Sequence, residues 1–308
     1  MRILLLFLDG VGIGKPVPDV NPFFRANLPH LRSLMEGEVP STRCKRLTTT
    51  RATLVPVNAT LGVPGLPQSG TGQTAIFTGV NASRLIGRHF GPHPTTTLRP
   101  VIEEKNIFRQ LKERGKSVCF VNAFPKQFFE YLETGNRRLS VTTLSCGYAG
   151  VPLLRLDSLR QNRAVSADIT RERWPERGDP PISTIAPEEA GRHCWSIARN
   201  HDFTLFEYWL TDYAGHSKDM GNSVEVLERL DGFLGGLLED FEPEGSLIVL
   251  VSDHGNIEDL STKSHTRNQV PCIVLGERRQ EFASRIKNLS HITPTILRFL
   301  DGSWETIS

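Results

Sequence analysis

Three apolar runs of strand length lie far apart in this chain, and each is followed by side chains that bind divalent metals. The runs are residues 3–8, 203–210 and 246–251. The side chains that follow them are Asp9, Asp212, His216, Asp253 and His254. Other strand-length runs alternate with helical patterns, which favours βαβ units and a mainly parallel sheet. Because open α/β sheets place their chemistry beyond the carboxyl ends of the strands, these side chains are predicted to meet at one edge.

The rest of the pattern predicts where the helices and further strands lie. Helices are expected at residues 28–35, 106–114, 188–199 and 222–241, and from residue 293 to about residue 302. Residues 222–225 resemble a capping box that opens the longest of them. Thr293 and Pro294 are expected to start the last one. Strands are expected at residues 117–121 and 271–275. The predicted fold class is therefore α/β, with a mainly parallel sheet flanked by helices.

The middle of the chain interrupts this alternation. Turn formers and arginines dominate between residues 124 and 183. We interpret this segment as a small cap inserted into an α/β core made of residues 1–123 and 184–308. Its arginines are Arg137, Arg138, Arg155, Arg160, Arg163, Arg171, Arg173 and Arg177. Guanidinium groups bind phosphate oxygens through paired hydrogen bonds, although a solvated surface explains most charge runs of this kind.

Composition excludes some partners and compartments. The chain has 308 residues and a formal net charge of +2, which gives no sign of a nucleic-acid or membrane partner. No apolar stretch approaches the ~20 residues that span a bilayer, and the run at residues 3–8 is too short for a signal-peptide core. The five cysteines are widely spaced without a CxxC pair. We expect a reduced, cytoplasmic protein, and the oligomeric state stays open.

The acidic and histidine side chains have spacings that suit metal binding. Asp212 and His216 are four residues apart, so one helical turn would aim both at one ion. The adjacent Asp253 and His254 can converge only where their strand breaks, which Gly255 allows. A single strand-end aspartate is more often a turn residue, but three such segments together favour a site. The candidate metal ligands are Asp9, Ser69, Asp212, His216, Asp253, His254 and His265. This mixture of oxygen and nitrogen ligands suits two ions, Zn²⁺ or Mn²⁺ rather than Ca²⁺.

A glycine-rich segment at residues 68–73 supplies a hydroxyl nucleophile. Ser69 precedes an apolar stretch and is expected at a helix N-terminus, where free N–H groups and the helix dipole favour an anion. A nearby metal ion would lower the pKa of the hydroxyl further. Two alternatives stay open at this point: Ser69 is a plain helix cap, or Thr71 is the nucleophile.

Four motifs together resemble the alkaline phosphatase superfamily, most closely its branch of cofactor-independent phosphoglycerate mutases and phosphopentomutases. They are LDGVG at residues 8–12, SGTGQ at 69–73, DHGN at 253–256 and HTRNQVP at 265–271. The resemblance implies an alkaline-phosphatase-like fold and a nucleophile at Ser69. It also implies one ion held by Asp212, His216 and His265. A second ion would be held by Asp9, Asp253, His254 and the Ser69 hydroxyl.

This sequence also departs from the patterns of its resemblance. Those mutases carry a larger inserted lid, whereas the segment between residues 124 and 183 is short. Gln73 stands where a histidine is usual in the mutases. The sulfatases of the superfamily need proline and arginine two and four residues after the nucleophile. Thr71 and Gln73 occupy those positions here, which argues against sulfate-ester chemistry.

These observations predict an enzyme that acts on a small, anionic, phosphorylated substrate. The first hypothesis is a two-metal phosphohydrolase that cleaves a phosphoester, or a related phosphonate, through a phosphoserine intermediate. The second is a phosphoglycerate or phosphopentose mutase with a shortened lid. The third is a non-catalytic binding protein of the same fold. The third is disfavoured because burying so many charged groups is costly without a catalytic use.

Overall fold

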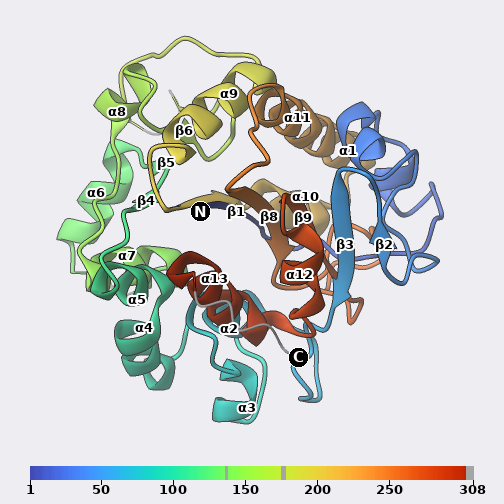
Figure 1. The fold of residues 1–308 in the computed structure, drawn as a ribbon, viewed down its shortest axis with the longest axis horizontal. Coiled ribbons are helices and arrows are strands. Elements are labelled where there is room, and N and C mark those ends of the chain that lie inside the picture. The colour runs from blue at the N-terminus through green and yellow to red at the C-terminus, as the bar shows by residue number, and fades with distance from the viewer. Residues whose placement is uncertain (136–137, 175–177, 303–308) are drawn as a thin grey trace.

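A seven-stranded sheet runs through the centre of the molecule and carries helices on both faces (Figure 1). The computed structural model describes residues 1–135, 138–174 and 178–302. The strand order is β2-β3-β9-β8-β1-β7-β4. The strands are β1 (Arg2–Leu8), β2 (Leu47–Thr48), β3 (Ala52–Val57), β4 (Val118–Phe120), β7 (Phe203–Tyr208), β8 (Ser246–Ser252) and β9 (Val270–Gly276).

The four strands β8, β1, β7 and β4 are parallel to one another, which confirms the predicted mainly parallel α/β fold. In this register Leu8 lies opposite both Tyr208 and Ser252. The carboxyl ends of the three central strands therefore coincide. Asp9 and Asp253 come directly after two of these ends, and Asp212 follows the third by one helical turn.

The other end of the sheet is antiparallel, which the sequence pattern did not predict. Strand β9, predicted at residues 271–275, runs antiparallel to β8, and β3 runs antiparallel to β9. A parallel return needs a crossover, usually through a helix. The segment between β8 and β9 contains no α-helix and instead carries Asp253, His254 and His265.

Both faces of the sheet are buried, because alternate side chains of β1 enter two separate cores. Ile3, Leu5 and Phe7 lie in one core. Leu4 and Leu6 lie in the other. The helices of the first core are α2 (Ser69–Thr78), α3 (Ala82–Ile86), α4 (Arg99–Lys105), α5 (Ile107–Glu113), α7 (Val141–Ala149), α12 (Arg279–Ser284) and α13 (Ile292–Asp301). Those of the second are α1 (Pro29–Leu34), α9 (Pro187–Ala198), α10 (Leu210–Ser217) and α11 (Met220–Glu239). Such double coverage explains why the central strands read as continuous apolar runs.

Two predicted helix starts are wrong by a few residues. The long helix α11 begins at Met220, and its cap is Asp219, whose carboxylate accepts the N–H of Asn222. The last helix, α13, begins at Ile292, directly after the 3-10 turn Leu289–His291. Thr293 therefore lies inside this helix. Its buried hydroxyl donates to the carbonyl of Ile76 at 2.6 Å, which joins α13 to α2.

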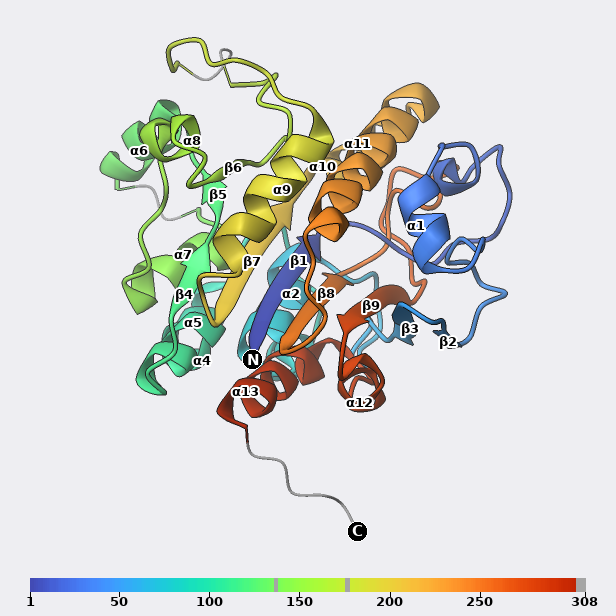
Figure 2. The ribbon, with the colours of Figure 1, turned by 45° about the horizontal axis from the view of Figure 1, so that its top comes forward.

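The segment between residues 124 and 183 contains two different kinds of element. Helices α6 (Lys126–Glu133) and α8 (Leu156–Arg160) lie beside the two-stranded sheet of β5 (Asn122–Ala123) and β6 (Val165–Ser166), on one side of the molecule (Figure 2). Helix α7, in contrast, packs into the first core through Val141, Leu144 and Cys146. The extent of the cap stays a prediction. Arg137 and Arg177 lie outside the described residues.

Two structural observations bear on what the composition predicts: the state of the cysteines and the length and hydrophobicity of the helices. All five cysteines are free thiols, and Cys146, Cys194 and Cys272 are buried. Among the helices of the described residues, none has the length and hydrophobicity that crossing a bilayer requires.

Helices α9 and α11 approach so closely that glycines are needed between them. A Cβ added at Gly236 would lie 1.9 Å from the carbonyl oxygen of Glu188, and one at Gly191 would lie 2.1 Å from that of Phe233. Backbone atoms form both contacts, so no side-chain rotation could relieve them.

We predict that Gly236→Ala destabilises the protein by about 2 kcal/mol or more, because overpacking forces the two helices apart. Gly221→Ala is the matched control on the same helix, since its added Cβ would meet only the Asp219 carboxylate, at 3.4 Å. It should leave stability unchanged or raise it slightly, because alanine favours a helix. Urea denaturation measures both changes. Equal stability of the two variants would contradict the close packing.

Candidate metal centre

The first part of the site forms around the Nε2 atom of His254. Ser69 Oγ lies 3.0 Å from this atom and Asp9 Oδ1 lies 3.3 Å from it. Asp253 Oδ2 lies 3.6 Å from it. His254 and Asp253 are fully buried, and Ser69 and Asp9 are nearly so. The break after β8 thus turns both adjacent side chains, Asp253 and His254, toward one point, as the sequence predicts.

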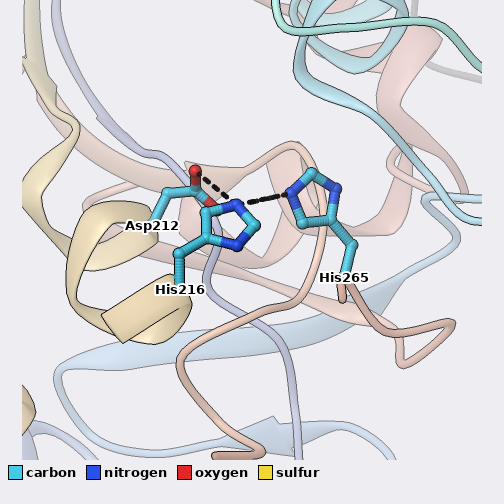
Figure 3. A group of neighbouring side chains, drawn as sticks. All are labelled: Asp212, His216 and His265. Atoms are coloured by element: carbon cyan, nitrogen blue, oxygen red, sulfur yellow. Dashed lines mark hydrogen bonds and ion pairs between the residues drawn. The ribbon is translucent and has the colours of Figure 1, made fainter. Parts of the chain in front are cut away.

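The second part of the site joins α10 to the segment before β9 (Figure 3). Asp212 and His216 lie one turn apart on α10, and Asp212 Oδ2 is 3.3 Å from His216 Nε2. His265 approaches from the opposite side. Its Nε2 atom lies 3.2 Å from His216 Nε2 and 3.6 Å from Asp212 Oδ1.

The two parts adjoin, so all seven predicted side chains gather in one place. The rings of His254 and His265 stack with their centroids 3.8 Å apart. Ligand atoms of Asp9, Asp212 and His254 all lie within 4.8 Å of one another, as do those of Asp212, His216 and His265. Asp212 belongs to both groups and therefore lies between them. The sequence resemblance had assigned it to one ion only.

The hydrogen bonds of the imidazoles show that their Nε2 atoms are available to bind a metal. Nδ1 of His265 bonds to the carbonyl of Pro67 at 2.8 Å, and Nδ1 of His216 bonds to the carbonyl of Lys263 at 2.9 Å. A carbonyl only accepts, so each Nδ1 carries the proton and each neutral ring keeps a lone pair on Nε2. When both rings are neutral, two lone pairs face each other across 3.2 Å; a proton on His216, whose pKa the hydrogen bond to Asp212 raises, would also relieve this conflict. A cation between them removes this conflict, and a carbonyl on the other nitrogen is the usual support of a metal-bound histidine.

The carboxylates show the same need for positive charge. Asp9 Oδ1 and Asp253 Oδ2 are buried and accept no hydrogen bond. Burial, with the charge of Asp253, raises the pKa of Asp9 to about 8. Burial alone would lower the pKa of His254, but Asp253 and Asp9 raise it to about 10. Protonation thus relieves the crowded negative charge, as divalent ions would. The donor set and its unpaired oxygens fit two such ions.

The structure distinguishes between the two candidate nucleophiles, Ser69 and Thr71. Ser69 is the first residue of α2 and Gln68 is its cap, so the Ser69 hydroxyl faces His254 without capping the helix. The Thr71 hydroxyl donates to the carbonyl of Gln68 and accepts the N–H of Phe90. Thr71 therefore holds the neighbouring loop, and in the described part of the chain its hydroxyl makes no hydrogen bond to His254 or to the carboxylates. This placement favours Ser69.

Sequence reasoning missed Glu258, a buried carboxylate that ties the ligand-bearing segments together. Its Oε2 accepts the N–H groups of Gly12 (2.9 Å) and Asn256 (2.7 Å). Its Oε1 accepts the Thr266 hydroxyl (2.5 Å) and the Asn268 amide (3.0 Å). These partners lie within three residues of Asp9, His254 and His265. The only sequence signal was a carboxylate directly after Ile257, five positions after Asp253.

Two further missed residues orient the carboxylates. Gln73 donates to Asp9 Oδ2 at 3.2 Å, from one turn beyond Ser69 on α2. Asn256 donates to Asp212 Oδ1 at 2.7 Å. The unusual Gln73 thus acts directly on a predicted ligand.

The chain is similar in sequence and in fold to several known proteins. The model of a family described as the metalloenzyme superfamily matches residues 187–303. The 2,3-bisphosphoglycerate-independent phosphoglycerate mutase of Wolinella succinogenes is 29% identical over 121 residues, which are 37% of this chain and 24% of the mutase. That of Synechococcus elongatus is 35% identical over 145 residues, which are 42% of this chain and 26% of the mutase. The matches thus span about a quarter of these relatives' length.

A solved structure shares the fold over nearly the whole chain. The alkaline phosphatase from the Antarctic bacterium TAB5 has a TM-score of 0.54 and 13% sequence identity, and the match covers 98% of this chain and 99% of that one. At this identity the likeness concerns the fold alone. Together, the matches confirm the resemblance to the alkaline phosphatase superfamily and its mutase branch that the four motifs predicted.

We predict that Asp253→Ala leaves the protein with one bound divalent ion in place of two and with almost no turnover, because the remaining ligands leave that ion's site open. Asp259→Ala is the control, since this nearby carboxylate bonds only within the turn to Ser261. It should keep both ions. Metal analysis of the dialysed proteins by mass spectrometry measures the content. Two ions in Asp253→Ala would refute its assignment as a ligand.

Glu258→Gln should weaken metal affinity by about 10- to 100-fold, as loss of supporting hydrogen bonds does at other metal sites. The amide NH₂ of the glutamine would face N–H and O–H groups that now donate hydrogen bonds to the carboxylate. The control is Asp231→Asn, because Asp231 is equally buried in α11 and accepts the N–H groups of His30 and Leu31 away from the site. Both variants should lose thermal stability, but only Glu258→Gln should lose affinity in a metal titration. Equal affinities would mean that Glu258 is only structural.

Proposed function

We propose that this chain is a two-metal phosphohydrolase that cleaves a phosphoester, or a related phosphonate, through a phosphoserine intermediate. One observation carries the proposal: a buried serine hydroxyl lies 3.0 Å from a histidine within a cluster of imidazole nitrogens and carboxylates. A binding protein gains nothing from a hydroxyl in this position. A nucleophile in this position is what phosphoryl transfer needs.

The proposed ions are Zn²⁺ or Mn²⁺, because the candidate ligands mix imidazole nitrogen with carboxylate oxygen. Asp212, His216 and His265 would hold one ion. Asp9, Asp253, His254 and the Ser69 hydroxyl would hold the other, with Asp212 close to both. When bound, such ions neutralise the phosphate oxygens and lower the pKa of a coordinated hydroxyl.

The chain's own residues account for the proposed reaction steps. The Ser69 oxygen loses its proton and attacks phosphorus, and the bond from phosphorus to the leaving alkoxide breaks. The alkoxide takes up a proton and leaves as the alcohol. Water then attacks the phosphoserine, which releases inorganic phosphate and restores the Ser69 hydroxyl. The N-terminus of α2 offers backbone N–H groups to the phosphoryl oxygens throughout.

The second candidate is a phosphoglycerate or phosphopentose mutase, which the named relatives favour. A mutase must hold the alcohol until the phosphoryl group returns to it. The short segment between residues 124 and 183 offers less cover than the lids of the mutases, which supports the hydrolase. The test is direct: metal-loaded protein is incubated with phosphomonoesters, including phosphoglycerate and pentose phosphate. Free phosphate supports the hydrolase, and an isomer without free phosphate supports the mutase.

Ser69→Ala should lose activity by at least about a thousandfold while both ions stay bound, because it removes the nucleophile and no other ligand side chain. Thr71→Ala should keep substantial activity, because the Thr71 hydroxyl bonds only to backbone groups. Acid quenching followed by peptide mass spectrometry should find the phosphoryl group on Ser69. A phosphoryl group on Thr71, or a Ser69→Ala variant as fast as the parent, would overturn the mechanism.

A further inference from the structure

A cavity of about 200 Å³ opens where β4 and β7 end, on the side of the sheet that α6 and β6 cover. Five of the side chains in its wall are aromatic. They are Phe120, Phe124, Phe128, Trp174 and Trp209. They come from three separate stretches of the chain, residues 120–128, 174 and 209, so no single local pattern reveals the cavity.

This cavity lies next to the candidate metal centre along the same edge of the sheet. Glu207, in its wall, pairs with Phe7 of the neighbouring strand, two residues before Asp9. Strand spacing and rise therefore put the backbone of Glu207 roughly 8 Å from that of Asp9. Trp209, also in the wall, comes three residues before Asp212.

The carboxylates of the wall already have partners within the protein. Glu207 accepts the hydroxyl of Thr142 at 2.7 Å. Asp168 accepts the backbone N–H groups of Arg171 (3.1 Å) and Arg173 (2.7 Å). The surface offered to a ligand is therefore mainly apolar.

Arg173 connects the cavity with the metal centre. Among the described arginines between residues 124 and 183, it alone lines this cavity. Its guanidinium group lies 5.5 Å from the ring centroid of Tyr213, an exposed side chain directly after Asp212. A positive charge in the cavity wall thus lies near the residue that follows Asp212, and the aromatic side chains belong to the same wall. A ligand that suits both has an anionic end and a flat apolar end.

We propose that this cavity binds the leaving group of the substrate, and that this group is a flat, mainly apolar alcohol of about the size of a benzyl group. This inference rests on the proposed phosphohydrolase function, because it assigns a place to the alcohol that the reaction releases. Flat rings pack well against aromatic walls of this kind. The volume of the cavity admits one such ring.

Benzylphosphonate and methylphosphonate carry an unactivated P–C bond with no alkoxide to expel, so their binding tests the inference without the effect of leaving-group reactivity. Calorimetry measures the binding of benzylphosphonate and of methylphosphonate to the metal-loaded protein. The parent should bind benzylphosphonate about tenfold more tightly or better, since burying a ring contributes more than the 1.4 kcal/mol that a factor of ten requires. Phe128→Ala should reduce this ratio severalfold.

Phe129→Ala is the matched control. Phe129 is the next residue on α6 and is also half-buried, but it lines a different pocket and its ring stacks under the guanidinium of Arg155 at 3.3 Å. This variant should keep the parent's ratio. A parent ratio near one, or equal ratios in the two variants, would overturn the leaving-group pocket.

The outcome also separates this inference from the proposed function. A preference for benzylphosphonate that depends on Phe128, in a protein that releases no phosphate from any ester, would keep the pocket and refute the hydrolase. Phosphate release without the preference would keep the hydrolase and refute the pocket.

Discussion

The site depends on one physical conflict: imidazole nitrogens and buried carboxylate oxygens converge with too little positive charge between them. His216 and His265 direct their Nε2 atoms at each other because backbone carbonyls take the protons of both Nδ1 atoms. Close by, Asp9 and Asp253 each have one buried carboxylate oxygen that accepts no hydrogen bond. Such an arrangement is costly in an empty protein and becomes favourable when cations enter. We therefore infer that metal binding contributes to the stability of this fold as well as to its chemistry.

The parallel centre of the sheet makes this convergence possible. Because β1, β7 and β8 end in register, three segments that are distant in sequence deliver their ligands to one point. Glu258 then fixes the segments to one another through four hydrogen bonds. The space that it fills explains the glycines around it, since a Cβ at Gly12 or Gly255 would lie about 2 Å from its carboxylate. Ligand position is thus set by backbone register first and by one buried carboxylate second.

The sequence predicts those features that follow from local pattern. Strand-length runs ending in Asp9 and Asp253 locate the sheet edge, and the Asp212–His216 spacing predicts their shared helical face. Features that depend on distant contacts were missed. The strand after His265 is antiparallel because its connection carries ligands in place of a crossover helix, and the start of α13 depends on a bond from Thr293 to α2. Glu258 and the aromatic cavity are likewise visible only when separate segments are placed together.

The most direct test is a crystal structure of the protein grown with Zn²⁺ or Mn²⁺, with anomalous scattering recorded at the metal's absorption edge. We predict two peaks at this edge of the sheet. One should be bounded by Asp212, His216 and His265, and the other by Asp9, Asp253 and His254 beside the Ser69 hydroxyl. A single peak, or metal bound elsewhere with His216 and His265 still facing each other, would contradict the two-metal site.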